Sequence, residues 1–381
     1  MTIVATTGRR DVSTRTAQMV DLISELGPDI PEIARKLGQF KESVRYRYKE
    51  KIMNRGFAVQ ATPDHQKLGL RRIILVIDFA AEYRQYAQAI LAAMNELCYL
   101  VDFAKTLPGG EYIADLSVPN DSTEEIVEFF HTLKEKGMFD RLEILESGWL
   151  MHAPMRAECY NFDNGRWDYD WSDGTKRTFK SASHQPSTQA KFDYTDLLII
   201  KELQMDANKS MKEISDKLGL NYKMLAWHYT AHVKANHLLQ GFSVNWMGTK
   251  YDYKIEKGLQ RQHRYFALEL IVRNVNEFEL ITLRQQLNTI PFLWSEVVGT
   301  NYNADFFIPL DFVVEGIQWL SEVMAPFKGR ADLFTMDQTQ SLAFTIPYTL
   351  FDQTQKKWVF KVEELTQRFD NLILQIKNGG S

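Results

Sequence analysis

The chain has 381 residues, of which 45% are hydrophobic and 25% charged, and its formal net charge at neutral pH is −4. A chain of this length and composition is expected to form several hydrophobic cores. We expect no membrane span and no signal peptide, because no stretch is long and apolar enough for either. Two cysteines, Cys98 and Cys159, are too few for a disulfide framework, which favours a cytoplasmic location. The acidic balance excludes nucleic-acid binding by the whole surface, so such binding would require a local basic patch.

The predicted organisation is a tandem pair of the same two domains. Glu-Ile-Ala-Arg-Lys-Leu-Gly at residues 32–38 returns as Glu-Ile-Ser-Asp-Lys-Leu-Gly at residues 213–219, and this separation is too long for a solenoid repeat. We expect an α+β fold with two tandem copies of a winged helix-turn-helix followed by a ferredoxin-like βαββαβ domain. In chain order, the expected segments are a flexible tail (1–16), winged helix 1 (17–68), βαββαβ domain 1 with an aromatic extension (69–172), a linker (173–192), winged helix 2 (193–260) and βαββαβ domain 2 with its extension (261–378).

The first winged helix is expected to contain three helices and a wing. Apolar side chains at helical spacing predict the first helix over residues 17–26. A capping box of Asp29 and Glu32 starts the second helix, and Gly38 ends it. A third helix is predicted over residues 41–53, followed by a strand and a polar loop that together would form the wing.

The third helix carries a basic face. Residues 35–55 include eight basic and two acidic side chains. Basic side chains on such a helix are suited to DNA phosphates and to guanine edges in the major groove. We therefore predict DNA contacts from this helix and the wing at Lys41, Ser43, Arg45, Tyr46, Arg47, Lys49 and Lys67.

The next region of each copy alternates strands and helices in the order βαββαβ, which is the ferredoxin-like arrangement. The turn between its second and third strands carries Tyr-Ile-Ala-Asp at residues 112–115 and Tyr-Asn-Ala-Asp at residues 302–305. Both copies continue into an aromatic stretch, at residues 154–171 and 347–360. The sequence leaves open whether these stretches add strands to a core or form a ligand or partner surface.

The second winged helix carries less positive charge than the first. A capping box of Ser210 and Glu213 starts its second helix, and a third helix is predicted over residues 222–235. Its predicted DNA contacts are Tyr222, Lys223, Trp227 and His228.

A metal site is the alternative for the histidines of this helix. His228 and His232, four residues apart on one helical face, are spaced as a chelating pair. They align with Arg47 and Lys51 of the first copy, and the sequence places no cysteine or acidic residue to complete a ligand shell. We therefore predict that they contact DNA and that no metal is bound.

A winged helix followed by a βαββαβ domain with a Gly-x-Tyr turn, here at Gly110 to Tyr112, resembles the leucine-responsive/asparagine-regulator (Lrp/AsnC, feast/famine) transcription factors. The resemblance covers about residues 17–146 and again 193–340. It implies that the two halves pair as an intramolecular pseudo-dimer, with an amino acid as a possible effector. Family members usually carry one winged helix per chain, and the aromatic extensions have no match in the family pattern.

The resulting prediction is a cytoplasmic, sequence-specific DNA-binding transcription regulator that is not an enzyme and holds no cofactor. Its partners would be double-stranded DNA, an amino-acid effector and a second copy of the chain, with no membrane. One alternative is an enzyme of the same architecture, because some proteins with this arrangement resemble haem-pathway decarboxylases. Another is an architectural or partner-docking protein that uses Tyr222 and Trp227.

Overall fold

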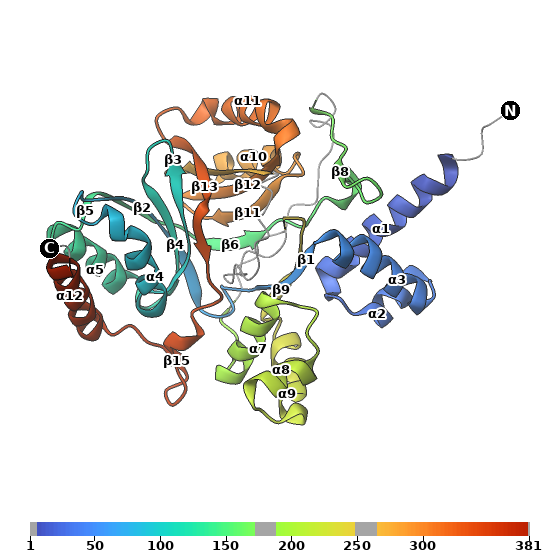
Figure 1. Ribbon diagram of the computed structural model, residues 1–381, viewed down its shortest axis with the longest axis horizontal. Coiled ribbons are helices and arrows are strands. Elements are labelled where there is room, and N and C mark those ends of the chain that lie inside the picture. The colour runs from blue at the N-terminus through green and yellow to red at the C-terminus, as the bar shows by residue number, and fades with distance from the viewer. Residues whose placement is uncertain (1–5, 172–187, 248–264, 380–381) are drawn as a thin grey trace.

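A computed structural model describes residues 6–171, 188–247 and 265–379 of the chain. The fold is α+β, with one large antiparallel sheet and helices around it (Figure 1). We call residues 6–171 the first half and residues 188–379 the second half. Among the described helices, none is both long and apolar enough to cross a membrane.

The first helical unit consists of α1 (Thr6–Leu26), α2 (Ile30–Leu37) and α3 (Lys41–Lys51). Helix α1 starts well before residue 17, so the predicted tail is largely helical. The Asp29 side chain accepts a hydrogen bond from the Glu32 amide, but the Glu32 carboxylate bonds Arg35 instead of returning to residue 29. Only half of the predicted capping box is therefore formed, and Gly38 ends α2 at a φ of 62° as expected.

The second helical unit consists of α7 (Tyr194–Met205), α8 (Met211–Leu218) and α9 (Tyr222–His228). The capping box of Ser210 and Glu213 is complete. Helix α9 continues as a π-helix over Tyr229–Lys234, which has no counterpart in α3. The two units therefore share their order of helices but differ in the helix that was expected to read DNA.

The predicted wings pair with each other and not within their own units. β1 (Ala58–Pro63) and β9 (Leu239–Asn245) form a two-stranded antiparallel ribbon, with Ala58 opposite Asn245 and Thr62 opposite Gly241. Each strand obtains from the other copy the hydrogen-bond partners that its own unit does not supply. The ribbon lies between the two helical units (Figure 1), so the expectation of two separate wings is wrong.

The large sheet is built from both halves. The first half supplies β2 (Leu70–Phe79), β3 (Leu100–Leu107), β4 (Tyr112–Pro119), β5 (Phe139–Glu146) and β6 (Trp149–His152), and the second supplies β10 (Tyr265–Val272), β11 (Leu293–Val298), β12 (Tyr302–Pro309) and β13 (Ala331–Ala343). Their order is β5-β2-β4-β3-β13-β10-β12-β11-β6. The halves therefore join twice, where β3 pairs with β13 and where β6 crosses over to pair with β11.

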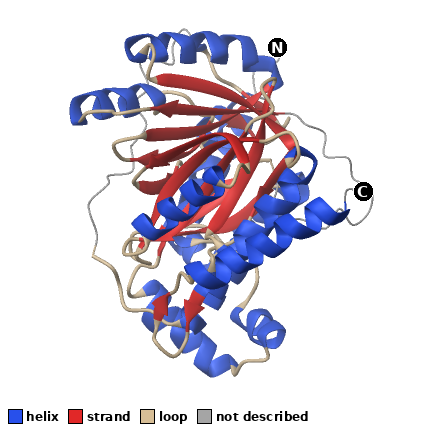
Figure 2. Cartoon of the chain, turned by 90° about the vertical axis from the view of Figure 1, so that its left-hand side faces the viewer, coloured by secondary structure: helices blue, strands red, loops and turns tan. Residues whose placement is uncertain are grey.

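Helices cover the outer side of the sheet (Figures 1 and 2). They are α4 (Ala87–Leu97), α5 (Thr123–Glu135), α10 (Glu277–Leu287), α11 (Val313–Met324) and α12 (Val362–Gly379). Helix α12 was not predicted, and it packs on α5, where the Phe129 and Phe369 rings lie 5.5 Å apart. The inner faces of the two halves share a small apolar core made by Ile74, Val76, Ile113, Leu145, Leu150, Ile271 and Val297.

Each helical unit shares a core with the sheet of the opposite half. Met19 and Val44 of the first unit belong to the same hydrophobic cluster as Leu270 and Phe306, whereas Leu197 and Leu225 of the second unit cluster with the first-half sheet. The aromatic extensions form two small hairpins, β7 (Tyr160–Asn161) with β8 (Arg166–Trp167) and β14 (Phe351–Asp352) with β15 (Lys357–Trp358). The halves are interlocked as a pseudo-dimer within one chain.

Candidate functional site

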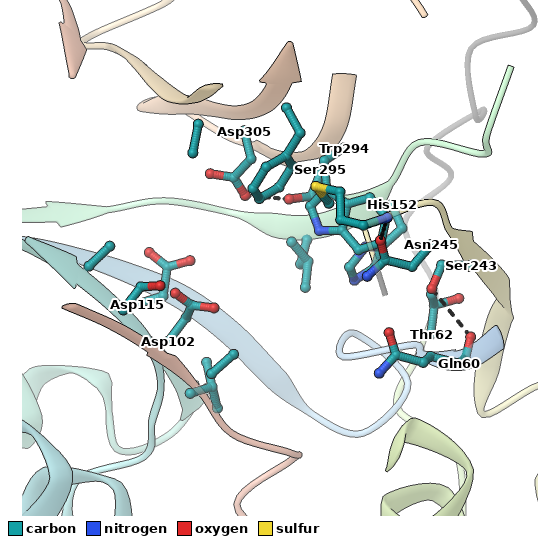
Figure 3. A pocket seen from close by; sticks show the side chains of 18 of the residues that line it. Gln60, Thr62, Asp102, Asp115, His152, Ser243, Asn245, Trp294, Ser295 and Asp305 are labelled. Atoms are coloured by element: carbon teal, nitrogen blue, oxygen red, sulfur yellow. Dashed lines mark hydrogen bonds between the residues drawn. The ribbon is translucent and has the colours of Figure 1, made fainter. Parts of the chain in front are cut away.

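A cavity of about 600 Å³ lies between the two halves. Its walls come from β2, β3, β4, β6, β10, β11, β12 and β13 of the large sheet and from the β1-β9 ribbon (Figure 3). This volume falls in the range typical of sites for small molecules and cofactors, about 300–1,000 Å³. The cavity therefore depends on both copies of the repeat.

Four carboxylic side chains form an acidic end of the cavity. Asp102 on β3 stands directly opposite Asp115 on β4, and Glu269 on β10 stands directly opposite Asp305 on β12. Alternation along each strand sends them inward, since Ala304 and Phe306, the neighbours of Asp305, belong to an outer core. Two ionised carboxylates directly across a ladder repel each other, which favours a proton on one member of such a pair.

Glu269 carries the clearest electrostatic perturbation at this end. Burial raises its pKa well above the ordinary value, and the nearby carboxylates of Asp305, Asp115 and Asp102 raise it further. Asn303 donates a hydrogen bond to the Glu269 carboxyl, which opposes these effects without outweighing them. Glu269 is therefore suited to carry a proton at neutral pH.

Arg72, His65 and His152 form a basic end of the same cavity. The Arg72 side chain is only 7% exposed, and its Nε and Nη1 atoms have no hydrogen-bond partner among the described residues. His65 Nδ1 lies 2.5 Å from the Ser117 hydroxyl. Burial lowers the pKa of His65 well below its ordinary value, and the Arg72 charge and His152 lower it further. A buried guanidinium with two nitrogens that donate no hydrogen bond to the described residues is suited to bind an anion.

The β6 crossover places His152 in the cavity. His152 stands opposite Ser295 of β11, and its ring lies edge-on to Trp294 with centroids 5.8 Å apart. The equivalent place in the other half, opposite Asp102, is occupied by Ala343. The duplicated fold therefore builds an asymmetric site, with Asp102 and Asp115 at one end and His152 at the other (Figure 3).

The ribbon closes the cavity with polar and aromatic groups. Asn245 Nδ2 and, just beyond β9, Trp246 Nε1 are buried and have no hydrogen-bond partner among the described residues. The Trp246 ring lies edge-on to Trp294, 5.8 Å away. These donors add to the anion-binding capacity of the basic end.

The residues predicted to contact DNA lie away from this cavity. On α3 the side chains of Lys41, Ser43, Arg45, Tyr46 and Lys49 are exposed, and Arg47 is half-buried. Arg45 pairs with Glu42 at 2.7 Å, and Arg47 donates to the Gln39 side chain at 2.8 Å. None of these residues lines the cavity.

The remaining predicted contacts divide between surface and interior. Tyr222, Lys223 and Trp227 are exposed on α9. Lys67 donates to the Asn236 carbonyl at 3.2 Å and so ties the two halves together. His228 is buried against the Asp196 carboxylate at 2.9 Å, so its predicted position on an outer DNA-facing surface is wrong.

Comparison with known proteins finds similarity in structure but not in sequence. No family model matches the chain, and no curated protein matches its sequence. The solved structure of the siroheme decarboxylase NirDL superimposes with a TM-score of 0.53 at 12% identity, over 93% of this chain and 99% of that chain. NirDL in complex with an iron-uroporphyrin III analogue gives a TM-score of 0.51 at 12% identity, over 97% and 99%.

The shared fold corrects the functional prediction made from the sequence. The chain shares its fold over nearly its whole length with NirDL and not with a DNA-binding regulator, so the prediction of a non-enzymatic regulator with double-stranded DNA as its partner is corrected. The alternative of a decarboxylase-like enzyme is better supported. The resemblance to the Lrp/AsnC regulators is supported only loosely, at the level of the fold.

None of the residues predicted as site residues from the sequence lines this cavity. One signal was available, because Asp115 and Asp305 end the shared Tyr-x-Ala-Asp motif; the structure places this motif at the start of β4 and β12 and not in a turn. His152 and Arg72 carried no such signal, since their neighbours in the cavity come from distant strands.

Proposed function

We propose that the chain is an enzyme that binds a carboxylated tetrapyrrole of the iron-porphyrin class in the central cavity and removes a carboxyl group from it. The observation that carries this proposal is the buried Arg72 guanidinium, whose Nε and Nη1 have no partner among the described residues, in a cavity that also holds Glu269 with a raised pKa. The fold shared with siroheme decarboxylase NirDL supports the choice of substrate and reaction.

The basic end supplies the binding energy. Arg72 offers Nε and Nη1 donors to one carboxylate of the substrate, and the Asn245 and Trp246 donors lie in the same cavity wall. Charge-assisted hydrogen bonds of this kind are roughly twice as strong as neutral ones. The carboxylate held here is an anchor and is not the one that leaves, because the guanidinium stabilises its ionised form.

The acidic end suits the carboxylate that leaves. An ionised carboxylate placed beside Asp102, Asp115 and Asp305 is repelled, whereas neutral carbon dioxide is not. The repulsion is therefore relieved as the reaction proceeds, and the remote Arg72 contact compensates for it in binding. The bond to the carboxyl carbon breaks, its electron pair remains on the substrate carbon, and carbon dioxide leaves.

Glu269 completes the reaction in this proposal. Its carboxyl group donates a proton to the substrate carbon, so that a C–H bond replaces the C–C bond, and solvent then reprotonates the carboxylate. His152, opposite the acidic end, orients the anchored side of the substrate through its ring.

The element order supports a finer interpretation of the fold. Both halves present three helices followed by a βαββαβ series, which is the arrangement expected of two tandem copies of a helix-turn-helix and a ferredoxin-like domain. Under this interpretation the domain limits remain close to residues 17–68, 69–172, 193–260 and 261–378. The helical units then serve to hold the halves together around the cavity.

The test uses the purified chain and ferric uroporphyrin. Binding is followed by the change in porphyrin absorbance, and loss of carboxyl groups is followed by mass spectrometry of the extracted pigment. We expect Arg72→Met to weaken binding about 10- to 100-fold. Glu269→Gln should still bind but lose turnover.

Arg71→Met is the matched control, because Arg71 is the neighbouring arginine on β2 and does not line the cavity. It should behave as the unaltered chain. Absence of porphyrin binding by the unaltered chain, or equal binding by the Arg72→Met and unaltered proteins, would contradict the proposed substrate class. Binding without carboxyl loss under any condition would contradict the reaction.

A further inference from the structure

A second polar cluster lies in the second helical unit, away from the cavity. Asp193 and Asp196 stand at the start of α7, and His228 and His232 project toward them from α9 and its π-helical continuation. One potential ligand atom from each of the four side chains lies within 4.8 Å of all the others. No acidic residue lies near these histidines in sequence, and the tertiary structure brings Asp193 and Asp196 to them.

The distances within the cluster match a metal ligand shell. Nδ1 of His228 lies 2.9 Å from Asp196 Oδ1 and 3.7 Å from Asp193 Oδ1, and Nδ1 of His232 lies 3.0 Å from Asp196 Oδ2. Ligands about 2.0–2.1 Å from a tetrahedral zinc ion are about 3.4 Å apart. The four groups can therefore close around one ion with small side-chain rotations.

Burial and outer contacts favour such a site. Asp196 is completely buried and the His228 side chain is 9% exposed, whereas Asp193 and His232 reach the surface. The Asp193 amide donates to Asp196 Oδ2 at 2.9 Å, which fixes that carboxylate from behind. The Trp227 ring packs on both imidazoles, with centroids 5.0 and 4.7 Å away. Outer hydrogen bonds that orient a carboxylate ligand are typical of metal centres.

The π-helix is a second feature specific to this unit. It begins directly after His228 and contains His232, and π-turns within helices are often found at functional sites. In the first unit α3 is a regular helix, and Arg47 and Lys51 occupy the positions equivalent to the two histidines. Lys51 pairs with Asp163 at 2.7 Å. Only the second copy thus combines the histidines, the acids and the altered helix.

We propose that Asp193, Asp196, His228 and His232 bind one divalent transition-metal ion, with Zn²⁺ as the ion best suited to two imidazoles and two carboxylates. The shell is complete with four protein ligands, so the ion has a structural role and joins α9 to the start of α7. The site is independent of the cavity and of the function proposed for it. Without an ion, the same side chains would form only a hydrogen-bonded network around Asp196.

The test is a metal titration of the full chain after chelator treatment and dialysis. We expect one Zn²⁺ per chain by isothermal titration calorimetry. With Co²⁺ as the probe, we expect the visible absorption of a tetrahedral site, a signal that a hydrogen-bonded network cannot give. Replacing His228 and His232 together by glutamine should weaken Zn²⁺ binding about 100-fold or more.

His131→Gln is the matched control, because His131 is an exposed histidine on α5 outside the cluster. It should bind Zn²⁺ as the unaltered chain does. Asp196→Asn provides a second test if the double variant fails to fold, and it should lower the affinity with the circular dichroism unchanged. Absence of stoichiometric Zn²⁺ binding, or binding unchanged in both cluster variants, would overturn the proposal.

Discussion

Replacing Arg72 by methionine is expected to stabilise the empty protein and to weaken its ligand binding. The Arg72 side chain is 7% exposed, and two of its three nitrogens lack a partner among the described residues. A buried polar group left without a hydrogen bond costs about 1–3 kcal/mol, and a charged group costs more. Methionine has a similar length without the charge, so we expect the free energy of unfolding to rise by about 2 kcal/mol.

The assay is urea unfolding at pH 7, followed by the fluorescence of the tryptophans. A stability gain appears as a higher midpoint with an unchanged slope. Arg71→Met is the control. Arg71 donates a hydrogen bond to the Ser147 carbonyl at 2.9 Å, and it is not among the described residues with a buried side-chain nitrogen that lacks a partner. It should be neutral or slightly destabilising.

With ligand bound, we expect the unaltered chain to be more stable than Arg72→Met. A ligand at 100 times its dissociation constant stabilises the folded state by about 2.7 kcal/mol, and this gain should be present in the unaltered chain but small in Arg72→Met. The reasoning is refuted if Arg72→Met is less stable than the unaltered chain without ligand. That result would show that the Arg72 guanidinium stabilises the folded state without ligand, so that anion binding is not needed to explain it.

Three further predictions concern the acidic end, the second helical unit and the β6 crossover. The folded state keeps the Glu269 proton that the unfolded chain releases. The free energy of unfolding should therefore fall as the pH rises above the ordinary glutamate pKa, by about 1.4 kcal/mol per unit of pKa elevation. Glu269→Gln should remove this pH dependence of unfolding. Burial opposes ionisation of Glu202, but three lysines within hydrogen-bond distance lower its pKa to about 2. The ionised carboxylate therefore stabilises the fold above the ordinary glutamate pKa, and this stabilisation is lost as the pH falls toward 2. Glu202→Gln should lower the free energy of unfolding by up to about 3 kcal/mol at pH 7. A Cβ on Gly148 would lie 1.8 Å from the Val298 carbonyl oxygen, so Gly148→Ala should cost about 3 kcal/mol in thermal or urea unfolding and weaken porphyrin binding by displacing His152.

Each of these predictions has an opposing outcome. An unchanged pH slope in Glu269→Gln would show that this carboxyl is not the group holding a proton. A Glu202→Gln variant as stable as the unaltered chain at pH 7 would show that the lysines do not depend on the carboxylate. Full stability and binding in Gly148→Ala would show that the crossover can shift without disturbing the cavity.

The sequence predicted the order of elements well, because that order depends on local signals. The capping residues Ser210 and Glu213 and the closing Gly38 fix helix ends through contacts within one turn. The expected βαββαβ order of strands and helices is present in both halves. The functional prediction was wrong because one local pattern is compatible with two environments. The exposed basic face of α3 can be solvated by water just as well as it can contact DNA.

The candidate sites could not be predicted in the same way. The cavity brings Arg72 and Asp102 of the first half together with Glu269 and Asp305 of the second, and no periodicity links positions so far apart. The proposed metal site likewise joins Asp196 of α7 to His232, which follows α9. The repeated Tyr-x-Ala-Asp motif, which begins β4 and β12, is the local signal in the sequence that includes Asp115 and Asp305.

The sequence by itself determined a duplicated α+β chain and the succession of most of its helices and strands, because these follow from side-chain spacing and from capping within a few residues. The tertiary structure decided that β1 pairs with β9, that β6 crosses to β11, and that each helical unit packs on the opposite half. These pairings satisfy strand edges and apolar faces that have no partner nearby in sequence. They also create the cavity, so the candidate function belongs to the pairing of the halves and to neither copy alone.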